Sequence, residues 1–373
     1  MKYNSKTLDE LCDVKIGKTP PRNQSEWFNS GASDDWKWVS IKDMGNCGKF
    51  ITTTAETITD KAKEAFNYAT VASGTILLSF KLTLGRVVIC DGKFVTNEAI
   101  AQLPIKDPSL IDRDYLYYYL KNYNWSNIGS TSSIATAVNS KMVKGIKINF
   151  PDLETQKKIA HILSALDKKI ELNKRISNNL LHISHQIYIN NIKNIPTTKT
   201  EKLGSLCRIK YGKGLPTSRV LKDGYRVYGG NGIIGFYNEK MYEKSQVLIS
   251  CRGAASGKVI FTRPDCFVTN NSLILECEDK YHYFIKEFSL DREYYDYTTG
   301  SAQPQITIDN IKDIELSVPD DQTLIRFNAI LRPLEEKYFT ILEENEALAK
   351  TRDALLPKLI SSEINLDKVM TDE

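Results

Sequence analysis

Side chains that can distinguish DNA bases stand in loop-like stretches of this 373-residue sequence. Arginine and lysine can bind the paired acceptors of guanine, and asparagine and glutamine can bind the donor and acceptor of adenine. In the second half of the chain, segments interrupted by glycine, serine or proline contain the candidates Arg219, Asn231, Arg252, Lys258, Asn270, Gln303 and Gln305. In the first half the corresponding candidates are Arg22, Lys42, Lys81, Arg86 and Asn97.

Some of these residues have a structural interpretation as well. Asn231 stands between two glycines, where we expect a turn residue with positive φ rather than a base contact. Asn97 and Asn270 follow β-type runs and are equally suited to satisfy backbone groups in loops. Lys81 and Arg252 follow the runs ILLSF and VLISC at nearby repeat positions, and there we favour a contact with DNA.

Other kinds of chemistry lack their residue patterns. The seven cysteines form no C-x-x-C pair and only four histidines are present, so we expect no zinc site and reduced, mostly buried thiols. The run RGAASGK from Arg252 misses the G-x-x-x-x-G-K-[ST] spacing of a phosphate-binding loop. The N-P-P-[YF] motif and glycine-rich turn of an amino-methyltransferase are absent, and the acidic pairs at 34–35 and 320–321 have no partnered E-x-K. We therefore expect no catalytic residue, no metal and no cofactor.

The chain contains an internal repeat, which explains why the candidates occur in two sets. Four segments of each half match in the same order and differ only in the lengths between them. The matched pairs are LDELCDVKIGKTP from Leu8 with LGSLCRIKYGKGLP from Leu203, ILLSFKLTLGRVV from Ile76 with VLISCRGAASGKVI from Val247, FVTNEAI from Phe94 with FVTNNSL from Phe267, and VKGIKINFP ending at Pro151 with IKDIELSVP ending at Pro319. Duplication is the simplest explanation of four ordered matches.

The elements that must position these residues are short strands and a few helices. Runs such as TILLSF, RVVIC, QVLIS, GKVIFT and SLILEC have β-type composition and are separated by Gly, Asn, Asp and Pro. Aromatic stripes at helical spacing predict helices at 112–123 and 279–290. The aromatic runs YLYYYL, at 115–120, and YYDY, at 294–297, could stack on bases, but we expect them in the core. We predict α+β domains at 1–150 and 196–318.

Two long helices are predicted at 151–195 and, with the C-terminal tail, at 319–373. Apolar residues recur at heptad spacing in both, with Asn173 and Asn345 on the seams. Pro333 and Pro357 are expected to mark bends. We predict that the helices pair as an antiparallel coiled coil with pseudo-twofold symmetry; the alternative is two surface helices packed on their own domains.

The charge distribution supports this pairing and a nucleic-acid partner. The net charge is +4, and residues 201–270 hold 12 basic against 5 acidic side chains. Residues 151–200 hold 8 basic against 4 acidic side chains, whereas residues 319–373 hold 7 against 12, so the helices have opposite net charges. The N-terminus is polar and no run of about 18 apolar residues occurs, so we expect a cytoplasmic protein.

From end to end the chain resembles the specificity subunit of type I restriction-modification enzymes. The resemblance rests on VYGGNGIIGF from Val227, VLISCRGAASGKV from Val247, FVTNNSLIL from Phe267, GSAQPQITIDNIKDIELSVP from Gly300, and ALLPKLISSEINL near the end. In the first half the counterpart of the GGNG stretch, VSIKDMGNCGKF, is looser.

This resemblance implies two target-recognition domains, each of which reads one half of a bipartite asymmetric site in double-stranded DNA. The two helices would set the unread gap. The partners would be two methyltransferase subunits that use S-adenosylmethionine and, in the full enzyme, two restriction subunits. The alternatives are a stand-alone DNA methyltransferase or nuclease, and a coiled-coil assembly scaffold that does not bind DNA.

Overall fold

The computed structural model describes residues 3–29, 36–127, 138–194, 199–300 and 304–364. The chain divides into two compact units, residues 1–172 with 345–373, and residues 173–344. These units differ from the predicted domain boundaries because each takes one part of both long helices. Among the described residues, no helix has the length and apolar character needed to cross a membrane.

The first unit is built around a five-stranded sheet of order β2-β10-β7-β8-β5. A second sheet of order β3-β6-β4-β9 and the pair β1–β11 complete its strands. The strand bounds are β1 Asn4–Thr7, β2 Lys15–Ile16, β3 Phe28–Asn29, β4 Trp36–Val39, β5 Phe50–Ile51, β6 Glu56–Ile58, β7 Ile76–Ser79, β8 Val87–Cys90, β9 Phe94–Thr96, β10 Ile100–Leu103 and β11 Lys147–Phe150. The helices are α1 Leu8–Leu11, α2 Ile41–Asn46, α3 Asp60–Ala65, α4 Arg113–Asn122 and α5 Ser140–Lys144.

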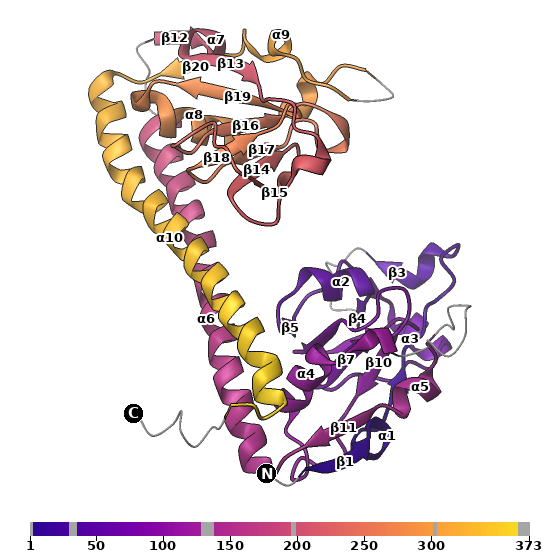
Figure 1. The fold of residues 1–373 in the computed structure, drawn as a ribbon. Coiled ribbons are helices and arrows are strands. Elements are labelled where there is room, and N and C mark those ends of the chain that lie inside the picture. The colour runs from indigo at the N-terminus through magenta and orange to yellow at the C-terminus, as the bar shows by residue number, and fades with distance from the viewer. Residues whose placement is uncertain (1–2, 30–35, 128–137, 195–198, 301–303, 365–373) are drawn as a thin grey trace. The chain divides into compact units, whose positions relative to one another are not determined.

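The second unit repeats this topology with fewer strands (Figure 1). Its sheets have the orders β13-β19-β16-β17 and β15-β14-β18, with the pair β12–β20. The strand bounds are β12 Lys199–Lys202, β13 Cys207–Tyr211, β14 Tyr225–Gly229, β15 Gly232–Tyr237, β16 Val247–Ser250, β17 Val259–Phe261, β18 Cys266–Val268, β19 Ser272–Cys277 and β20 Glu315–Val318. The helices are α7 Leu203–Leu206, α8 His282–Leu290 and α9 Ile308–Ile311.

The predicted duplication is confirmed by equivalent strand pairings and by one close approach. β4 pairs in parallel with β9, and β14 pairs in parallel with β18. A Cβ atom on Gly17 would lie 2.1 Å from the carbonyl oxygen of Thr96, and one on Gly212 would lie 2.2 Å from that of Thr269. Only glycine fits such an approach, so the sequence match has a steric cause.

The aromatic helices belong to the cores, as predicted. Tyr115, Tyr117 and Tyr118 of α4 are at most 1% exposed, and Phe284 and Ile285 of α8 are equally buried. These rings are therefore unavailable to stack on bases. In the YYDY run Tyr294 is buried, but Tyr295 is 60% exposed, so the expectation of a core position was wrong for Tyr295. The cysteines are free and mostly buried, also as predicted.

The two long helices are α6, Leu153–Tyr188, which continues as a π-helical turn Ile189–Lys193, and α10, Asp321–Ile360. Their heptad seams are filled: early α6 packs with late α10 in the first unit's core, and Tyr188 packs with Phe327 in the second unit's core. Within the second unit Asn173 of α6 bonds to Glu344 of α10 and Tyr188 of α6 packs against Phe327 of α10, so these two helical segments run antiparallel. α10 continues through Pro333 and Pro357.

The polar contacts between the two long helices are not those that their opposite net charges would suggest. Asn173 Nδ2 donates to Glu344 Oε2 at 2.9 Å, as its buried position requires, but the Oδ1 atom of Asn345 is buried without a hydrogen-bond partner. Arg352 Nη1 donates to Asp167 Oδ1 at 2.7 Å. This pair joins a cation of the acidic helix to an anion of the basic helix, so net charge did not predict the contact.

Candidate nucleic-acid interface

The loop between β7 and β8 presents candidate base-reading residues of the first unit. Ser79 closes it: its backbone N–H donates to the Arg86 carbonyl at 2.9 Å, and the Gly85 N–H donates to the Ser79 carbonyl at 3.0 Å. The Ser79 hydroxyl donates to the Thr83 carbonyl and accepts from the Arg86 N–H at 3.0 Å. The backbone is therefore held, while the Lys81 side chain is exposed.

The loop between β16 and β17 has the same closure in the second unit. The Ser250 N–H donates to the Lys258 carbonyl at 2.9 Å, and the Gly257 N–H donates to the Ser250 carbonyl at 2.9 Å. Arg252 follows the strand as Lys81 follows β7, and Lys258 stands where the first unit has Arg86. The two loops thus share two closing backbone hydrogen bonds and their basic character, although the second loop is one residue longer and contains a 3-10 turn at Gly253–Ala255.

Arg252 is exposed and lies beside a second candidate. Its backbone forms a β-bridge with Gln305, and the Gly253 N–H donates to the Pro304 carbonyl at 3.2 Å. Gln305 is half-buried and is fixed through its backbone to Thr299. Gln303 lies outside the described residues. The structure therefore brings Arg252 and Gln305 together from segments that are 53 positions apart.

Lys258 and Asn231 form another pair. Lys258 Nζ donates to Asn231 Oδ1 at 2.7 Å, and both residues line an open pocket of about 450 Å³ with Tyr295, which is 60% exposed. Asn231 lies in the turn between β14 and β15, as expected. The left-handed backbone of that turn belongs to Gly232, with φ of 122°, so the expectation of positive φ at Asn231 was wrong.

Arg219 and Asn270 are partly committed to the fold. The Arg219 guanidinium bonds to the Tyr237 hydroxyl and lies 5.1 Å from the centre of its ring. Asn270 is half-buried, its N–H donates to the Lys213 carbonyl at 3.2 Å, and its carbonyl accepts from the Cys251 thiol.

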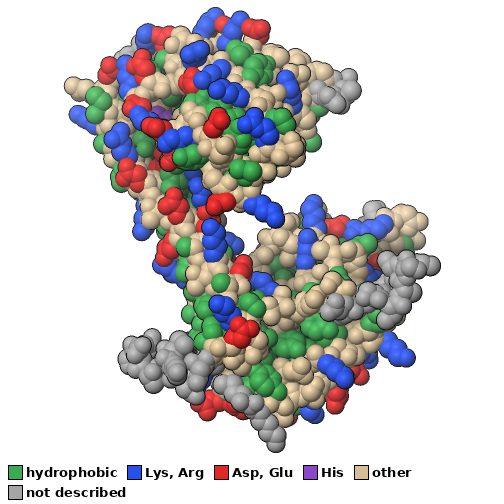
Figure 2. Space-filling model, viewed as in Figure 1, with side chains coloured by type: hydrophobic (Ala, Val, Ile, Leu, Met, Phe, Trp, Pro, Cys, Tyr) green, Lys and Arg blue, Asp and Glu red, His purple; other side chains and the backbone are tan. Residues whose placement is uncertain are grey.

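The first unit shows the same division between exposed and engaged side chains. Lys42 is exposed on α2. Arg86 Nη1 donates to the Ile41 carbonyl at 2.6 Å, which joins the loop to α2. Arg22 pairs with Glu56 at 2.7 Å and stacks over the Phe28 and Trp38 rings, and Asn97 Oδ1 accepts from the Ala99 N–H at 3.0 Å. Figure 2 shows lysine and arginine side chains at the surface of both domains.

One residue of the first loop was missed by the reasoning from sequence. Leu82 is 97% exposed and has a φ of 60°. The aligned residue of the second loop is Gly253, with a φ of 76°. The signal in the sequence was the alignment of Leu82 with Gly253, because a glycine in a loop often marks a backbone with positive φ.

In each unit the tyrosine- or phenylalanine-rich helix, α4 or α8, is linked to both long helices through side-chain contacts. In the first unit the Tyr118 hydroxyl donates to Asp167 of α6 at 2.5 Å, and Asp167 also accepts from Arg352 of α10. These contacts position the strands and loops on the helices.

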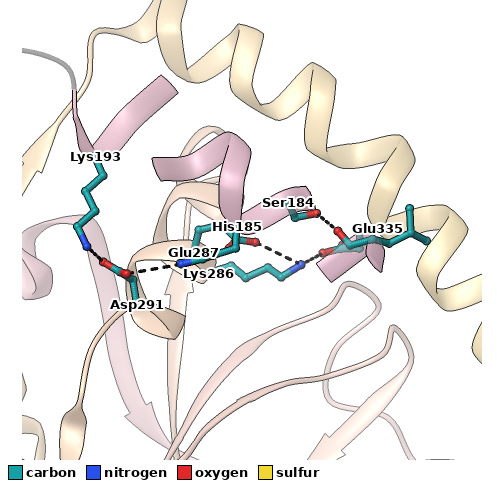
Figure 3. A network of polar contacts seen from close by, with 8 residues as sticks. Ser184, His185, Lys193, Lys286, Glu287, Asp291 and Glu335 are labelled. Carbon is teal, nitrogen blue, oxygen red and sulfur yellow. Dashed lines mark hydrogen bonds and ion pairs between the residues drawn. The ribbon is translucent and has the colours of Figure 1, made fainter. Parts of the chain in front are cut away.

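In the second unit the tie is a network of polar and charged side chains around the buried residues Lys286, Glu287 and Glu335 (Figure 3). Lys286 Nζ lies 3.1 Å from Glu335 Oε1 of α10, and His185 of α6 lies 3.5 Å from Glu287 and 3.6 Å from Asp291. Burial raises the pKa of Glu287, which is 1% exposed, because water no longer stabilises its charge. The network fixes α8 between the two long helices, with Lys286, Glu287 and Glu335 buried and His185 and Asp291 partly exposed.

The described residues contain no group of three or more His, Cys, Asp or Glu side chains arranged to hold a metal ion. What they do contain is two copies of a mixed domain, each with a closed basic loop, attached to two long helices. This arrangement defines a duplicated two-domain protein with one basic loop in each copy.

The comparisons with known proteins identify the family. The model of the type I restriction modification DNA specificity domain matches residues 1–182 and 197–348, so the chain belongs to this family and contains the domain twice. As a member of this family it serves DNA sequence recognition rather than catalysis, and its two domains fit a bipartite site.

Relatives and a solved structure agree with this family. The MjaIX specificity subunit of a type I restriction enzyme from Methanocaldococcus jannaschii is 23% identical, over 98% of this chain and 94% of that protein. The EcoprrI specificity subunit from Escherichia coli is 21% identical, over 87% and 85%. The crystal structure of a type I S subunit from M. genitalium has a TM-score of 0.59 and 20% identity, covering 96% of each chain, and therefore has the same fold.

Proposed function

We propose that this chain is the specificity subunit of a type I restriction-modification complex and that each domain reads one half of a bipartite, asymmetric DNA site. Two methyltransferase subunits would supply adenine methylation from S-adenosylmethionine, and two restriction subunits would supply ATP-driven cleavage in the full complex. The relatives are named as specificity subunits of such enzymes. These partners would place the protein in the cytoplasm.

The observation that carries this proposal is the repeated loop. Lys81 and Arg252 are exposed at the same place of two loops that share two closing backbone hydrogen bonds. A loop with a fixed backbone and a variable side chain is what two readers of different sequences require. The first reader would recognise one half-site, and the second reader the other.

The exposed candidates are the better-supported contacts. Lys42, Lys81, Arg252 and Lys258 are exposed, and Gln305 is held beside Arg252. The remaining candidates would serve in the same interface with part of their hydrogen-bonding capacity already used, namely Arg22, Arg86, Asn97, Arg219, Asn231 and Asn270. Gln303 is proposed from its place in the sequence alone.

We further propose that α6 and α10 set the unread gap and dock the methyltransferase subunits. At 1.5 Å per residue, helices of 36 and 40 residues extend about 54 and 60 Å. Packed seams within each unit support a role of these helices as a common support for both domains.

The test is reconstitution of the full chain with its methyltransferase subunits. We expect the complex to methylate one bipartite motif and the chain alone neither to bind nor to use S-adenosylmethionine. Binding of the cofactor by the chain alone would favour a stand-alone methyltransferase. In a titration with duplex DNA, the logarithm of affinity should fall linearly with the logarithm of salt concentration. A complex that assembles but shows no affinity for DNA would favour the scaffold.

A further inference from the structure

We propose that Leu82 makes an apolar contact with the bases of the half-site that the first domain reads. The inference rests on the proposed function and adds a residue that carries sequence information. Leu82 is 97% exposed, whereas the next most exposed large hydrophobic side chain among the described residues, Ile325, is 63% exposed.

The backbone conformation of Leu82 is itself unfavourable for a leucine. Its φ of 60° lies in the left-handed region, where the Cβ atom of an L-residue is crowded. The second domain places Gly253 at the aligned position, with φ of 76°, and glycine adopts this conformation without a steric penalty. The shared loop therefore requires the conformation, and the first domain fills it with a residue that gains no packing in return.

The loop is rigid enough to hold Leu82 outward. Gly85 has a φ of 85°, and a Cβ atom there would lie 2.4 Å from Cδ1 of Trp125, so the indole packs directly against the backbone. The hydroxyl of Ser79 bonds to the Thr83 carbonyl and to the Arg86 N–H. Leu82 thus projects from a braced loop, so the backbone that carries it does not need to be ordered on binding.

The basic residues around Leu82 favour a nucleic acid as the molecule that contacts it. Lys81 is adjacent and exposed, and Arg86 ties the loop to α2 through the Ile41 carbonyl, next to the exposed Lys42. Cations at these places would hold phosphates and bring Leu82 against a groove. A phosphate offers nothing to a leucine, whereas a thymine methyl group or an opened base step does.

The experiment compares Leu82→Gly with the unaltered chain, each assembled with its methyltransferase subunits. The probe is a synthetic duplex with the motif that the unaltered complex methylates in cells. We expect Leu82→Gly to bind roughly 10- to 150-fold more weakly if the leucine side chain becomes fully buried in the complex. The salt dependence should stay the same because no charge is removed. The matched control, Lys81→Gln, should lower the slope of the salt dependence.

Two further measurements separate the outcomes. Leu82→Gly should unfold at the same or a higher temperature, and Leu82→Asn, which also tolerates positive φ, should reproduce the binding loss. With uracil in place of thymine in the first half-site, a loss of affinity only in the unaltered chain assigns the contact to a methyl group, and no loss assigns it to an opened step.

Equal binding by Leu82→Gly and the unaltered chain would overturn the inference and leave the proposed function intact. Equal binding of the motif and of a scrambled duplex by the unaltered complex would instead contradict the proposed function itself.

Discussion

Lengthening both long helices by one heptad tests whether they set the gap between the half-sites. The insertion is placed after Asn173 in α6, with a matching heptad beside Glu344 in α10, because these residues are hydrogen-bonded at 2.9 Å. Seven residues keep the apolar seam in phase and add about 10.5 Å of helix at 1.5 Å per residue. At 3.4 Å per base pair, this is about three base pairs.

The assay is the methylated motif of cells that contain each variant. We expect the paired insertion to lengthen the unread gap by roughly three base pairs and to leave both half-sites unchanged. An insertion in α6 alone is the control: it puts the seams out of step and should abolish assembly with the methyltransferase subunits. An unchanged gap with persistent methylation in the paired variant would refute the ruler.

Three other predictions concern single residues. If Arg252 contacts a base, Arg252→Ala should weaken DNA binding by about 1–3 kcal/mol and relax specificity at one position. If it contacts a phosphate, affinity should fall equally for all DNA sequences and should depend less steeply on salt concentration. Unchanged affinity with a lower melting temperature would mark Arg252 as structural. Burial raises the pKa of Glu287 above 4.5, so the folded chain holds this proton more tightly than the unfolded chain does. The unaltered chain therefore loses stability as pH rises from about 4.5 through the raised pKa, and Glu287→Gln, which does not titrate, should become more stable relative to it over this range. Urea unfolding at acid and neutral pH measures this gain, and a difference that does not change with pH would contradict it. Gly212→Ala should lower the free energy of unfolding by at least about 1–3 kcal/mol, because its Cβ atom would lie 2.2 Å from a backbone oxygen that cannot move aside; a melting temperature equal to that of the unaltered chain would show that the approach relaxes.

Much of the fold could be predicted because its signals are local in sequence. Strands at 76–79 and 247–250 follow from short apolar runs between breakers, and the aromatic helices follow from their spacing. The long helices follow from sustained heptads. The comparison of the two halves then predicted that they share one topology, which cannot be inferred from either half alone.

The side-chain contacts could not be predicted because they depend on distant segments. Arg86 bonds to Ile41 and Arg219 to Tyr237, so two basic candidates are partly engaged by residues that are 45 and 18 positions away. The net charges of the helices suggested attraction, yet Arg352 and Asp167 pair in the opposite sense. Ion pairs depend on the distance between two atoms, which a sum over a helix does not contain.

The central claim is that each copy of the repeat reads its own half-site, and reciprocal exchange of the domains tests it most directly. Residues 1–150 are replaced by those of a relative with a different motif, and residues 196–318 are replaced in a second variant, with both long helices retained. The methylated motif is then mapped in cells with each chimera. We expect each exchange to change one half of the motif and to leave the other half and the gap intact. A change of both halves by one exchange would contradict the claim.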